Sequence, residues 1–499
     1  MCLPILFKAR NNAPPRMNKT IVSAVLALAA HLSLGTADVS AQLIRQPNTT
    51  LNLSETSPPA TLSATGAFSN LATLTPNAGI FPYEPNVPFW SDYAEKRRWF
   101  SIPNVNDRMT FDADGNWALP TGMVWVKHFD LPLDRTNPAA PRRRLETRFL
   151  VKTAGGSYGL TYKWRDDQTE ADLVGPDGED AFYQVQSNGQ TLKQRWHYPA
   201  RYECMDCHTA IGGHALSFNT RQMNRSHPYG SQNPNQIQAL SDAGYFTAPV
   251  RGVSNLPALA KANDTTQSLE WRVRSYFMAN CMQCHQPGGP SFAIWDARAT
   301  TRTDAANIIN GMLSYVGDDP ANRFVVPGDL SHSMAYKRIL GIEPRMPPIG
   351  TTELDPGAIQ LLQDWITQEL PGRLSFAQWQ VQFFGSSGNP SASETADPDR
   401  DGHSNFEEFH SYTDPTSASS APARPQGSLV NGGTAVQFNF TQPRNRAVLV
   451  ETSTDTKNWS VWDVPGNSVD YPLVARSRSL VAPLQGDPRR FFRLRLSTP

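Results

Sequence analysis

One short pattern occurs twice in the 499-residue chain and limits its possible folds more than any other feature. Residues 204–208 read Cys-Met-Asp-Cys-His and residues 281–285 read Cys-Met-Gln-Cys-His, so both have the form C-x-x-C-H. Cysteines three residues apart are separated by about one helical turn. Both thiols can therefore bond to the two vinyl groups of one haem, while the adjacent histidine binds the iron. The pattern predicts attachment through Cys204, Cys207, Cys281 and Cys284, with His208 and His285 as iron ligands.

Redox disulfides, zinc binding and coincidence fit the two motifs less well than haem attachment does. A redox disulfide is expected within a thioredoxin-like βαβ pattern, which surrounds neither motif. Zinc-binding cysteine pairs rarely carry a histidine directly after each C-x-x-C. Coincidence could produce one such pentapeptide but hardly two in a chain that has only one further cysteine, Cys2. We therefore expect two covalently bound c-type haems.

The N-terminal region resembles an export signal. A start at Met17 would place Lys19 before an apolar run over residues 21–34, and Val39-Ser40-Ala41 offers small residues for cleavage after Ala41. The run is too short to span about 30 Å of hydrocarbon, and no other stretch is long and apolar enough. The sequence predicts a periplasmic or secreted protein, with the signal peptide removed near Ala41 and no membrane span.

Composition narrows the class of protein further. Lys and Arg total 45, as do Asp and Glu, so the formal charge is zero and no nucleic-acid partner is expected. The 41 prolines and 33 glycines favour loops and short strands over a helical bundle. Shifts in composition predict these segments: 1–41 signal peptide, 42–68 flexible leader, 69–200 β-rich domain, 201–262 first haem segment, 263–372 cytochrome c domain with the second haem, 373–427 helix and calcium-loop linker, and 428–499 C-terminal β domain.

The expected fold class is multidomain α+β. Alternating aromatic and small residues over 158–164 indicate a half-buried strand of the N-terminal β-rich domain. The central part is expected to be an all-α cytochrome c region with two haems. Alternation returns in the tail, where Val436, Phe438 and Phe440 share one face, and this predicts a small β-sandwich-like domain.

The second motif has the surroundings of a cytochrome c. Upstream, Thr266 is expected to cap a helix that runs into Cys281. Downstream, Met346 precedes two prolines that stiffen its loop, and a thioether suits haem iron as second axial ligand. Asp355-Pro356 then opens a last helix. Met346 is thus the predicted second iron ligand at this haem, although an isolated methionine is more often part of a core.

The first motif has no Met-Pro-Pro after it before the second motif begins. We favour Met223 as its sixth ligand. His214 and His227 also follow the motif, His128 and His197 precede it in the β-rich region, and an open iron site is a further alternative. Taken singly, each of these residues is more simply interpreted as having an ordinary structural role.

Several stretches between about residues 75 and 372 carry a resemblance to a known family. They are Phe81–Asn86, Trp90–Asp92, Arg144–Arg148, Trp196–Pro199 and the first motif, Ala279–Pro290, Val326–Asp329 and Arg345–Pro348. Together they resemble a family of exported di-haem c-type cytochromes, and the second-haem half is also similar to cytochrome c domains associated with bacterial quinoprotein dehydrogenases. The resemblance implies electron transfer in the cell envelope, with a sugar or alcohol dehydrogenase as a candidate redox partner, and it fixes no substrate.

A twelve-residue acidic stretch, 397–408, matches the calcium loop of the EF-hand. Clustered oxygens suit a hard cation, Gly402 allows the sharp turn at position 6, and the final glutamate can bind through both oxygens. An acidic, solvated turn is the simpler alternative. The predicted ligands are Asp397, Asp399, Asp401, the backbone carbonyl of His403, Asn405 and Glu408.

Three functions remain open from the sequence. The leading one is an exported electron carrier with two haems and no catalytic residues of its own. A di-haem peroxidase-like enzyme with an open first iron is the alternative. The third is a binding module, in which the N-terminal β domain docks a dehydrogenase or a polysaccharide.

Overall fold

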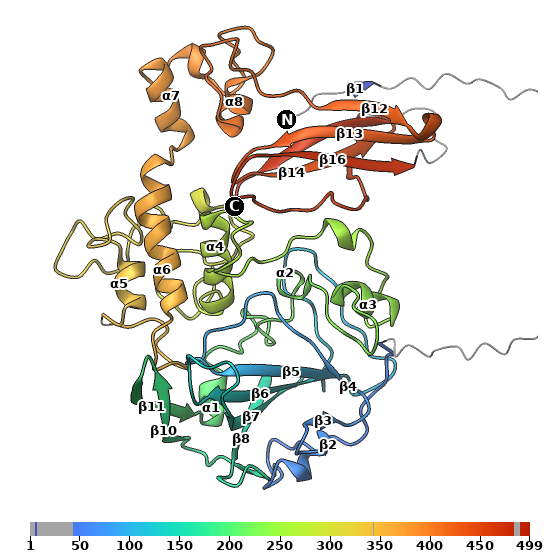
Figure 1. Ribbon diagram of the computed structural model, residues 1–499, viewed down its shortest axis with the longest axis vertical. Coiled ribbons are helices and arrows are strands. Elements are labelled where there is room, and N and C mark those ends of the chain that lie inside the picture. Colours follow the sequence, from blue (N-terminus) through green and yellow to red (C-terminus); the bar gives the residue numbers. More distant parts are fainter. Residues whose placement is uncertain (1–4, 7–42, 343, 484–489) are drawn as a thin grey trace, which may run out of the picture.

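The computed structural model describes residues 5–6, 43–342, 344–483 and 490–499. The predicted signal peptide and its cleavage point near Ala41 lie outside these ranges. The described chain forms three tiers along its long axis: an N-terminal sheet, a middle tier around helices α4 and α6, and a second β region (Figure 1). No helix of the described residues has the length and apolarity needed to cross a membrane.

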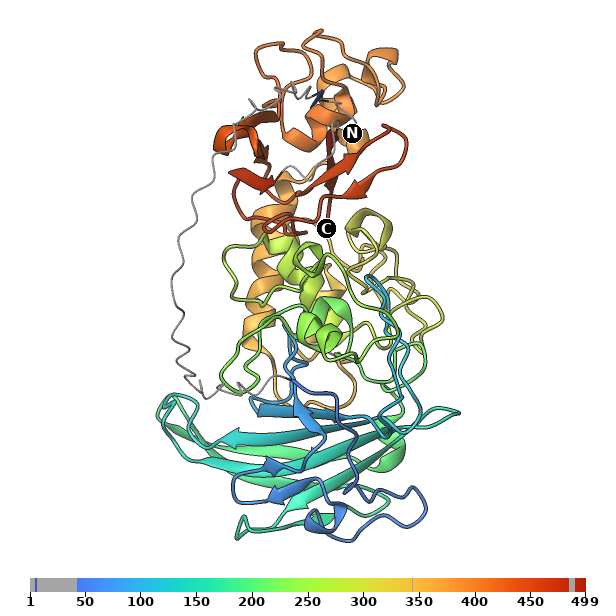
Figure 2. The ribbon, with the colours of Figure 1, turned by 90° about the vertical axis from the view of Figure 1, so that its right-hand side faces the viewer.

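The N-terminal tier is built on a six-stranded antiparallel sheet with strand order β4-β5-β6-β7-β8-β9, seen nearly edge-on in Figure 2. One face packs on a buried cluster that includes Leu62, Phe68 and Trp164. The other face turns toward the first C-x-x-C-H motif. The strands are β4 (Ile80–Pro82), β5 (Glu95–Ser101), β6 (Val124–Pro132), β7 (Arg142–Lys152), β8 (Ser157–Trp164) and β9 (Ala171–Leu173), with the pair β2 (Phe68–Asn70) and β3 (Thr75–Pro76) and the hairpin β10 (Glu179–Ser187) and β11 (Gln190–Tyr198) beside them.

The prediction of a central all-α region is wrong. The chain is only 18% helical and 27% strand, and residues 281–333 contain no α-helix. Prolines and glycines such as Pro287 and Gly288 interrupt this stretch, and its short turns pack on the helices instead of extending them. The central helices are α1 (Arg201–Cys204), α2 (Thr220–Met223), α3 (Gln236–Asp242), α4 (Leu269–Asn280), α5 (Met334–Ile339) and α6 (Pro356–Asp364).

Two of these helices correspond to those expected around the second motif. Helix α4 is capped by Ser268, whose hydroxyl accepts a hydrogen bond from the Trp271 amide, so the expected cap at Thr266 is two residues too early. Helix α6 begins as expected, with Asp355 as its cap, and continues through a π-helical turn, η4 (Trp365–Glu369). The two helices share one core cluster with Trp295 and Phe324.

The third tier contains two antiparallel sheets, with orders β12-β13-β16 and β1-β17-β14-β15, around a core that includes Phe438 and Phe492. This tier packs on the middle one: the ring of Tyr471 lies 4.6 Å from that of Trp271, centroid to centroid. The elements are β1 (Ile5–Leu6), β12 (Gln426–Val430), β13 (Ala435–Gln442), β14 (Ala447–Ser453), β15 (Ser460–Val461), β16 (Arg476–Pro483) and β17 (Phe491–Ser497), preceded by α7 (Phe376–Phe384) and α8 (Asn405–Ser411).

Candidate haem sites and calcium loop

The first motif lies on the inner face of the N-terminal sheet. Helix α1 begins after Ala200, whose amide donates to the carboxylate of Glu203 (2.6 Å). It then passes so close to strand β8 that a Cβ at Gly159 would lie 2.5 Å from Sγ of Cys204. Only a residue without a side chain permits this approach. The sheet and the motif are therefore fitted to each other at one glycine.

A cavity of about 190 Å³ opens between the sheet and this motif. Cys204, Cys207 and His208 all line it. Apolar and aromatic side chains form much of its wall, including Trp125, Leu150 and Trp196. Residues 349–352, which follow Met346 in the chain, close another side. A flat, largely apolar group attached to Cys204 and Cys207 would thus be screened from water.

The ring of His208 is held in a form that can bind iron. Its Nδ1 donates a hydrogen bond to the carbonyl oxygen of His214 (2.5 Å), which leaves the lone pair of Nε2 available. Burial lowers the pKa of His208 to about 4, so the ring is neutral at pH 7. A second hydrogen bond of this kind is what orients metal-binding histidines.

The predicted sixth ligand, Met223, does not lie on the described wall of this cavity. Its side chain is fully buried in a cluster with Phe218, Ile237 and Leu240, where it has a packing role. The structure therefore does not bring Met223 and His208 to one cavity.

The alternative histidines are also engaged elsewhere. His214 holds His208 through its carbonyl, and its ring bonds Ser157. His128 bonds Thr147 and Asp130, away from the motif. His197 does line the cavity, but its two ring nitrogens bond Asp180 and Glu203. His227 packs edge-on against Tyr229.

The second motif continues directly from α4. The amide of Cys281 donates to the carbonyl of Phe277, and the amide of His285 donates to that of Cys281, so the motif extends the helical path. The imidazole of His285 stacks on the indole of Trp295, with ring centroids 4.7 Å apart. Burial, with a contribution from Arg338, lowers the pKa of His285 to about 4. This histidine is likewise neutral and held in place by its surroundings.

Met346 lies near the second motif through a shared neighbour. Its amide donates to the carbonyl of Arg338 (3.1 Å), the arginine whose charge acts on His285. Arg345, the preceding residue, ties the loop down by donating to the carbonyls of Thr352 and Glu353. The side chain of Met346 is half-buried. Its role as an iron ligand stays a prediction.

The two motifs touch each other although 77 residues separate Cys207 from Cys284 in the chain. The thiols of these two cysteines lie close enough to influence each other, and the nearby Cys207 thiol lowers the pKa of the Cys284 thiol. Beside them, Gln286 donates to the carbonyl of Ile211 (3.3 Å). The second cysteines of both predicted attachment sites therefore meet at one point.

The residues present fit two covalently bound haems. Each motif pairs two free thiols with a neutral histidine, half-buried at His208 and buried at His285, and the first opens on a walled cavity. Sequence reasoning missed the contributions of Gly159, of Trp295 and of the cations Arg98, Lys127 and Arg148 on the cavity wall. In the sequence, only Lys127 points to these residues, because it is a charged side chain within a largely apolar strand sequence.

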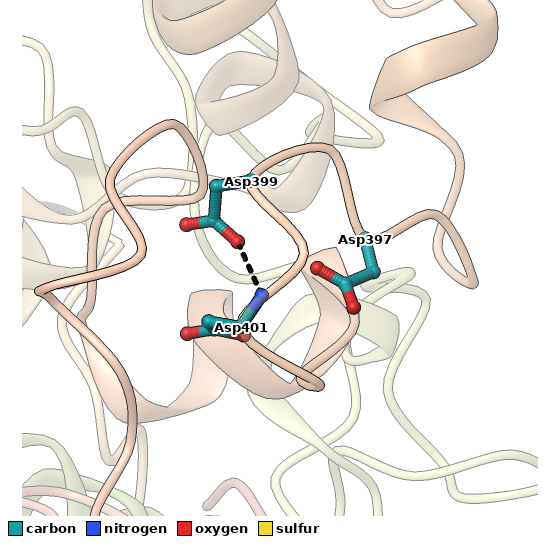
Figure 3. Close-up of side chains that lie close together, drawn as sticks. All are labelled: Asp397, Asp399 and Asp401. Atoms are coloured by element: carbon teal, nitrogen blue, oxygen red, sulfur yellow. Dashed lines mark hydrogen bonds between the residues drawn. The ribbon is translucent and has the colours of Figure 1, made fainter.

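The predicted calcium loop gathers its acidic side chains as expected from the spacing. Oxygens of Asp397, Asp399 and Asp401 all lie within 4.8 Å of one another (Figure 3). The amide of Asp401 donates to Asp399 Oδ1 (3.2 Å), and the amide of Gly402 donates to Asp397 Oδ2 (3.1 Å). Loop turns of this kind also occur without a cation.

Asn405 and Glu408 of helix α8 supply a second observation. Both side chains are completely buried, yet Asn405 Oδ1 and Glu408 Oε2 have no hydrogen-bond partner among the described residues. Burial and the neighbouring charges, chiefly Asp399, raise the pKa of Glu408 to about 7. One buried carboxylate oxygen and one buried amide oxygen without partners, beside three aspartates, are the donor set that calcium prefers. His403 is itself buried, and its backbone carbonyl alone belongs to the predicted set.

Comparisons with protein-family models, with curated proteins and with solved structures return no match for this chain. The assignment of function therefore rests on the sites themselves.

Proposed function

We propose that the protein is an exported c-type cytochrome that carries two covalent haems and passes electrons between them. The observation that carries this proposal is the approach of the two motifs, at the Cys207 and Cys284 thiols and at the hydrogen bond from Gln286 to the Ile211 carbonyl. Because each thiol is the second attachment point of its motif, the two haem edges bonded there would also be neighbours. Electron transfer between adjacent edges needs no protein motion, which suits a relay.

The chain's own residues hold and insulate the two centres. Haem bound at these motifs supplies an iron that takes up and releases one electron. The four cysteines fix the position of the macrocycles, and His208 and His285 bind the irons through neutral imidazoles. The His214 carbonyl and the Trp295 ring fix the orientation of those two imidazoles. The apolar cavity wall excludes water from the first centre.

The proposed setting is the cell envelope. The predicted signal peptide and the compartment in which c-type haems are attached agree on this. A sugar or alcohol dehydrogenase, such as a quinoprotein dehydrogenase, is the proposed redox partner through the family resemblance.

A peroxidase-like enzyme is the second candidate, and one observation favours it. Among the described residues, no methionine lines the first cavity, and its one further histidine, His197, bonds two carboxylates. An iron there without a sixth protein ligand could bind peroxide. A single optical experiment distinguishes the two functions.

Intact mass of the purified protein and its optical spectrum test the proposal together. We expect the mass of two haems above that of the processed chain, with low-spin spectra that peroxide leaves unchanged. A high-spin component that reacts with peroxide would replace the carrier by the enzyme. A mass equal to that of the bare polypeptide would contradict both functions.

We further propose that calcium binds at residues 397–408 and fixes this segment to the third tier. Calcium should raise the thermal stability of the full-length protein by mass action, and chelation should expose the segment to protease. Glu408 must lose its proton to bind, so calcium affinity should rise with pH up to about 7. Without calcium, stability depends on pH with the opposite sign. Because the pKa of Glu408 is raised in the folded state, its protonation stabilises the fold, and this stability is lost as pH rises toward 7.

Glu408→Gln tests the calcium site, and Glu407→Gln is its matched control. Glu407 is adjacent on α8 but its carboxylate accepts from the Ser404 amide and belongs to the helix cap. Calorimetry should show calcium binding weakened by Glu408→Gln and retained by Glu407→Gln. Identical proteolysis with and without chelator at millimolar calcium would leave the loop as an acidic turn.

A further inference from the structure

Three cationic side chains form a row across the N-terminal sheet. Arg98 of β5 is paired directly with Lys127 of β6, and Lys127 is paired with Arg148 of β7. Directly paired residues place their side chains on the same face, about 5 Å apart. All three side chains line the cavity that opens on the first motif. Like charges in this arrangement repel one another, so the row needs an anion to balance it.

Only part of that charge is balanced within the protein. Arg148 forms a two-point ion pair with Glu146, with distances of 2.6 and 2.8 Å. Among the described residues, Arg98 and Lys127 have no carboxylate within ion-pair distance, although Arg98 is only 7% exposed. Burial lowers the pKa of both side chains, and for Lys127 the charge of Arg98 adds to the effect. The Lys127 ammonium also lies 4.8 Å from the centroid of the Phe129 ring. Neither Arg98 nor Lys127 therefore has a carboxylate in ion-pair contact at the cavity, among the described residues.

The neighbouring row of the sheet is apolar. Phe100, Trp125 and Leu150 are paired in the same way, and Leu150 is paired in turn with Gly159. Gly159 is the residue that Cys204 approaches. The wall is thus apolar beside the attachment cysteines and cationic two residues further along the strands, a distance of about 7 Å.

A c-type haem has the same polarity. Its thioether bonds lie on one side of the macrocycle and its two propionate carboxylates lie on another edge. Attachment through Cys204 would place the apolar part of the ring against Trp125 and Leu150. The two propionate carboxylates would then supply the negatively charged partners that Arg98 and Lys127 lack.

We propose that Arg98 and Lys127 bind the two propionate groups of the first haem, with the Arg148–Glu146 pair fixing the edge of that site. The inference rests on the proposed function, because it needs a haem at residues 204–208. Charge-assisted bonds between cations and carboxylates are among the strongest hydrogen bonds in proteins. Positive charge beside the macrocycle also favours the reduced iron, so these residues set the potential of the first haem.

Redox titration of the haem-loaded, full-length protein tests the assignment. In Arg98→Gln and in Lys127→Gln, the ratio of reduced to oxidised first haem at a fixed potential should fall about tenfold, or about 59 mV for one electron. The second haem should stay as in the parent. Signals of the first haem are assigned in the Cys281→Ala/Cys284→Ala variant, which carries the first haem alone.

The matched control is Lys163→Gln. Lys163 lies on the neighbouring strand β8, but it pairs with Glu179 (3.3 Å) and is not part of the cavity wall. This variant should leave both potentials unchanged. Unchanged potentials in Arg98→Gln and Lys127→Gln, with two haems present by mass, would overturn the inference while leaving the proposed function intact. Absence of the first haem from the parent protein would instead overturn the proposed function.

Thermal unfolding gives an independent readout. With haem attached, Lys127→Gln should lower the melting temperature, because it removes a partner of a carboxylate. In a Cys204→Ala/Cys207→Ala background the same substitution should raise it, because it removes a half-buried cation that has no carboxylate partner. A shift of the same sign in both backgrounds would contradict the assignment.

Discussion

The two C-x-x-C-H motifs are nearly identical in sequence, but the protein builds their surroundings in different ways. The second is continuous with helix α4, and its histidine stacks on Trp295, only ten residues away. The first lies on a four-residue helix, and its cavity wall comes largely from strands β5 to β8, whose residues lie about 40 to 110 positions earlier. The C-x-x-C-H motif therefore predicts where a haem would be attached, whereas residues elsewhere in the chain form the surroundings of that site.

The two sites also differ in how their surroundings are stabilised. The second motif adjoins a packed apolar core that includes Met282, Trp295 and Phe324. The surroundings of the first include a cavity and two cations, the buried Arg98 and the half-buried Lys127, without carboxylate partners among the described residues. The first site should therefore depend on its haem more strongly than the second.

Removing one attachment site at a time should give the largest effect. Cys204→Ala/Cys207→Ala and Cys281→Ala/Cys284→Ala should each lose the mass of one haem. The first variant should also show the larger fall in melting temperature, because it leaves the cavity empty and its cations without a carboxylate partner. Equal falls in calorimetry would break the comparison between the two sites.

Met346→Ala should change the second centre alone. Loss of the thioether should free one position on the iron, lower the potential of that haem and create a site that binds carbon monoxide. Met223→Ala is the comparison variant: its side chain is core, so it should cost about 2–5 kcal/mol of stability without changing either potential. Spectra and potentials of Met346→Ala that match the parent would refute the ligand assignment.

Gly159→Ala should disturb the first centre through packing. The added methyl group meets Sγ of Cys204, and overpacking of this kind costs about 1–3 kcal/mol. Attachment of the first haem should fall, as measured by intact mass, while the second stays complete. Gly155→Ala, at a position with nothing within 4 Å, should have neither effect.

Ser268→Ala should have the smallest effect and should act on the second centre. It removes the cap of the helix that leads into Cys281, at a cost of about 1 kcal/mol in chemical denaturation. Thr266→Ala lies two residues earlier and leaves the cap in place, so it should be nearly neutral. Comparable losses in both variants would contradict the observed cap position.

The sequence predicted what depends on neighbours along the chain. The motifs, the helix start at Asp355 and the clustering of Asp397, Asp399 and Asp401 follow from short spacings, and the structure shows that helix start and that cluster. The all-α prediction is wrong because a C-x-x-C-H motif does not require helices throughout its region, and prolines and glycines keep residues 281–333 irregular. The cavity of the first motif could not be predicted, since it depends on strand register across more than 100 residues.

The meeting of Cys207 and Cys284 also bears on how the protein matures. Before haem is attached, these two thiols lie side by side in the folded chain. An oxidant that joined them would leave each motif with a single thiol, and neither haem could then form both of its bonds. If the chain carries the two proposed haems, folding and attachment would compete. A reductant that keeps the two thiols apart, or attachment to a chain not yet folded, would then be a condition for loading both haems.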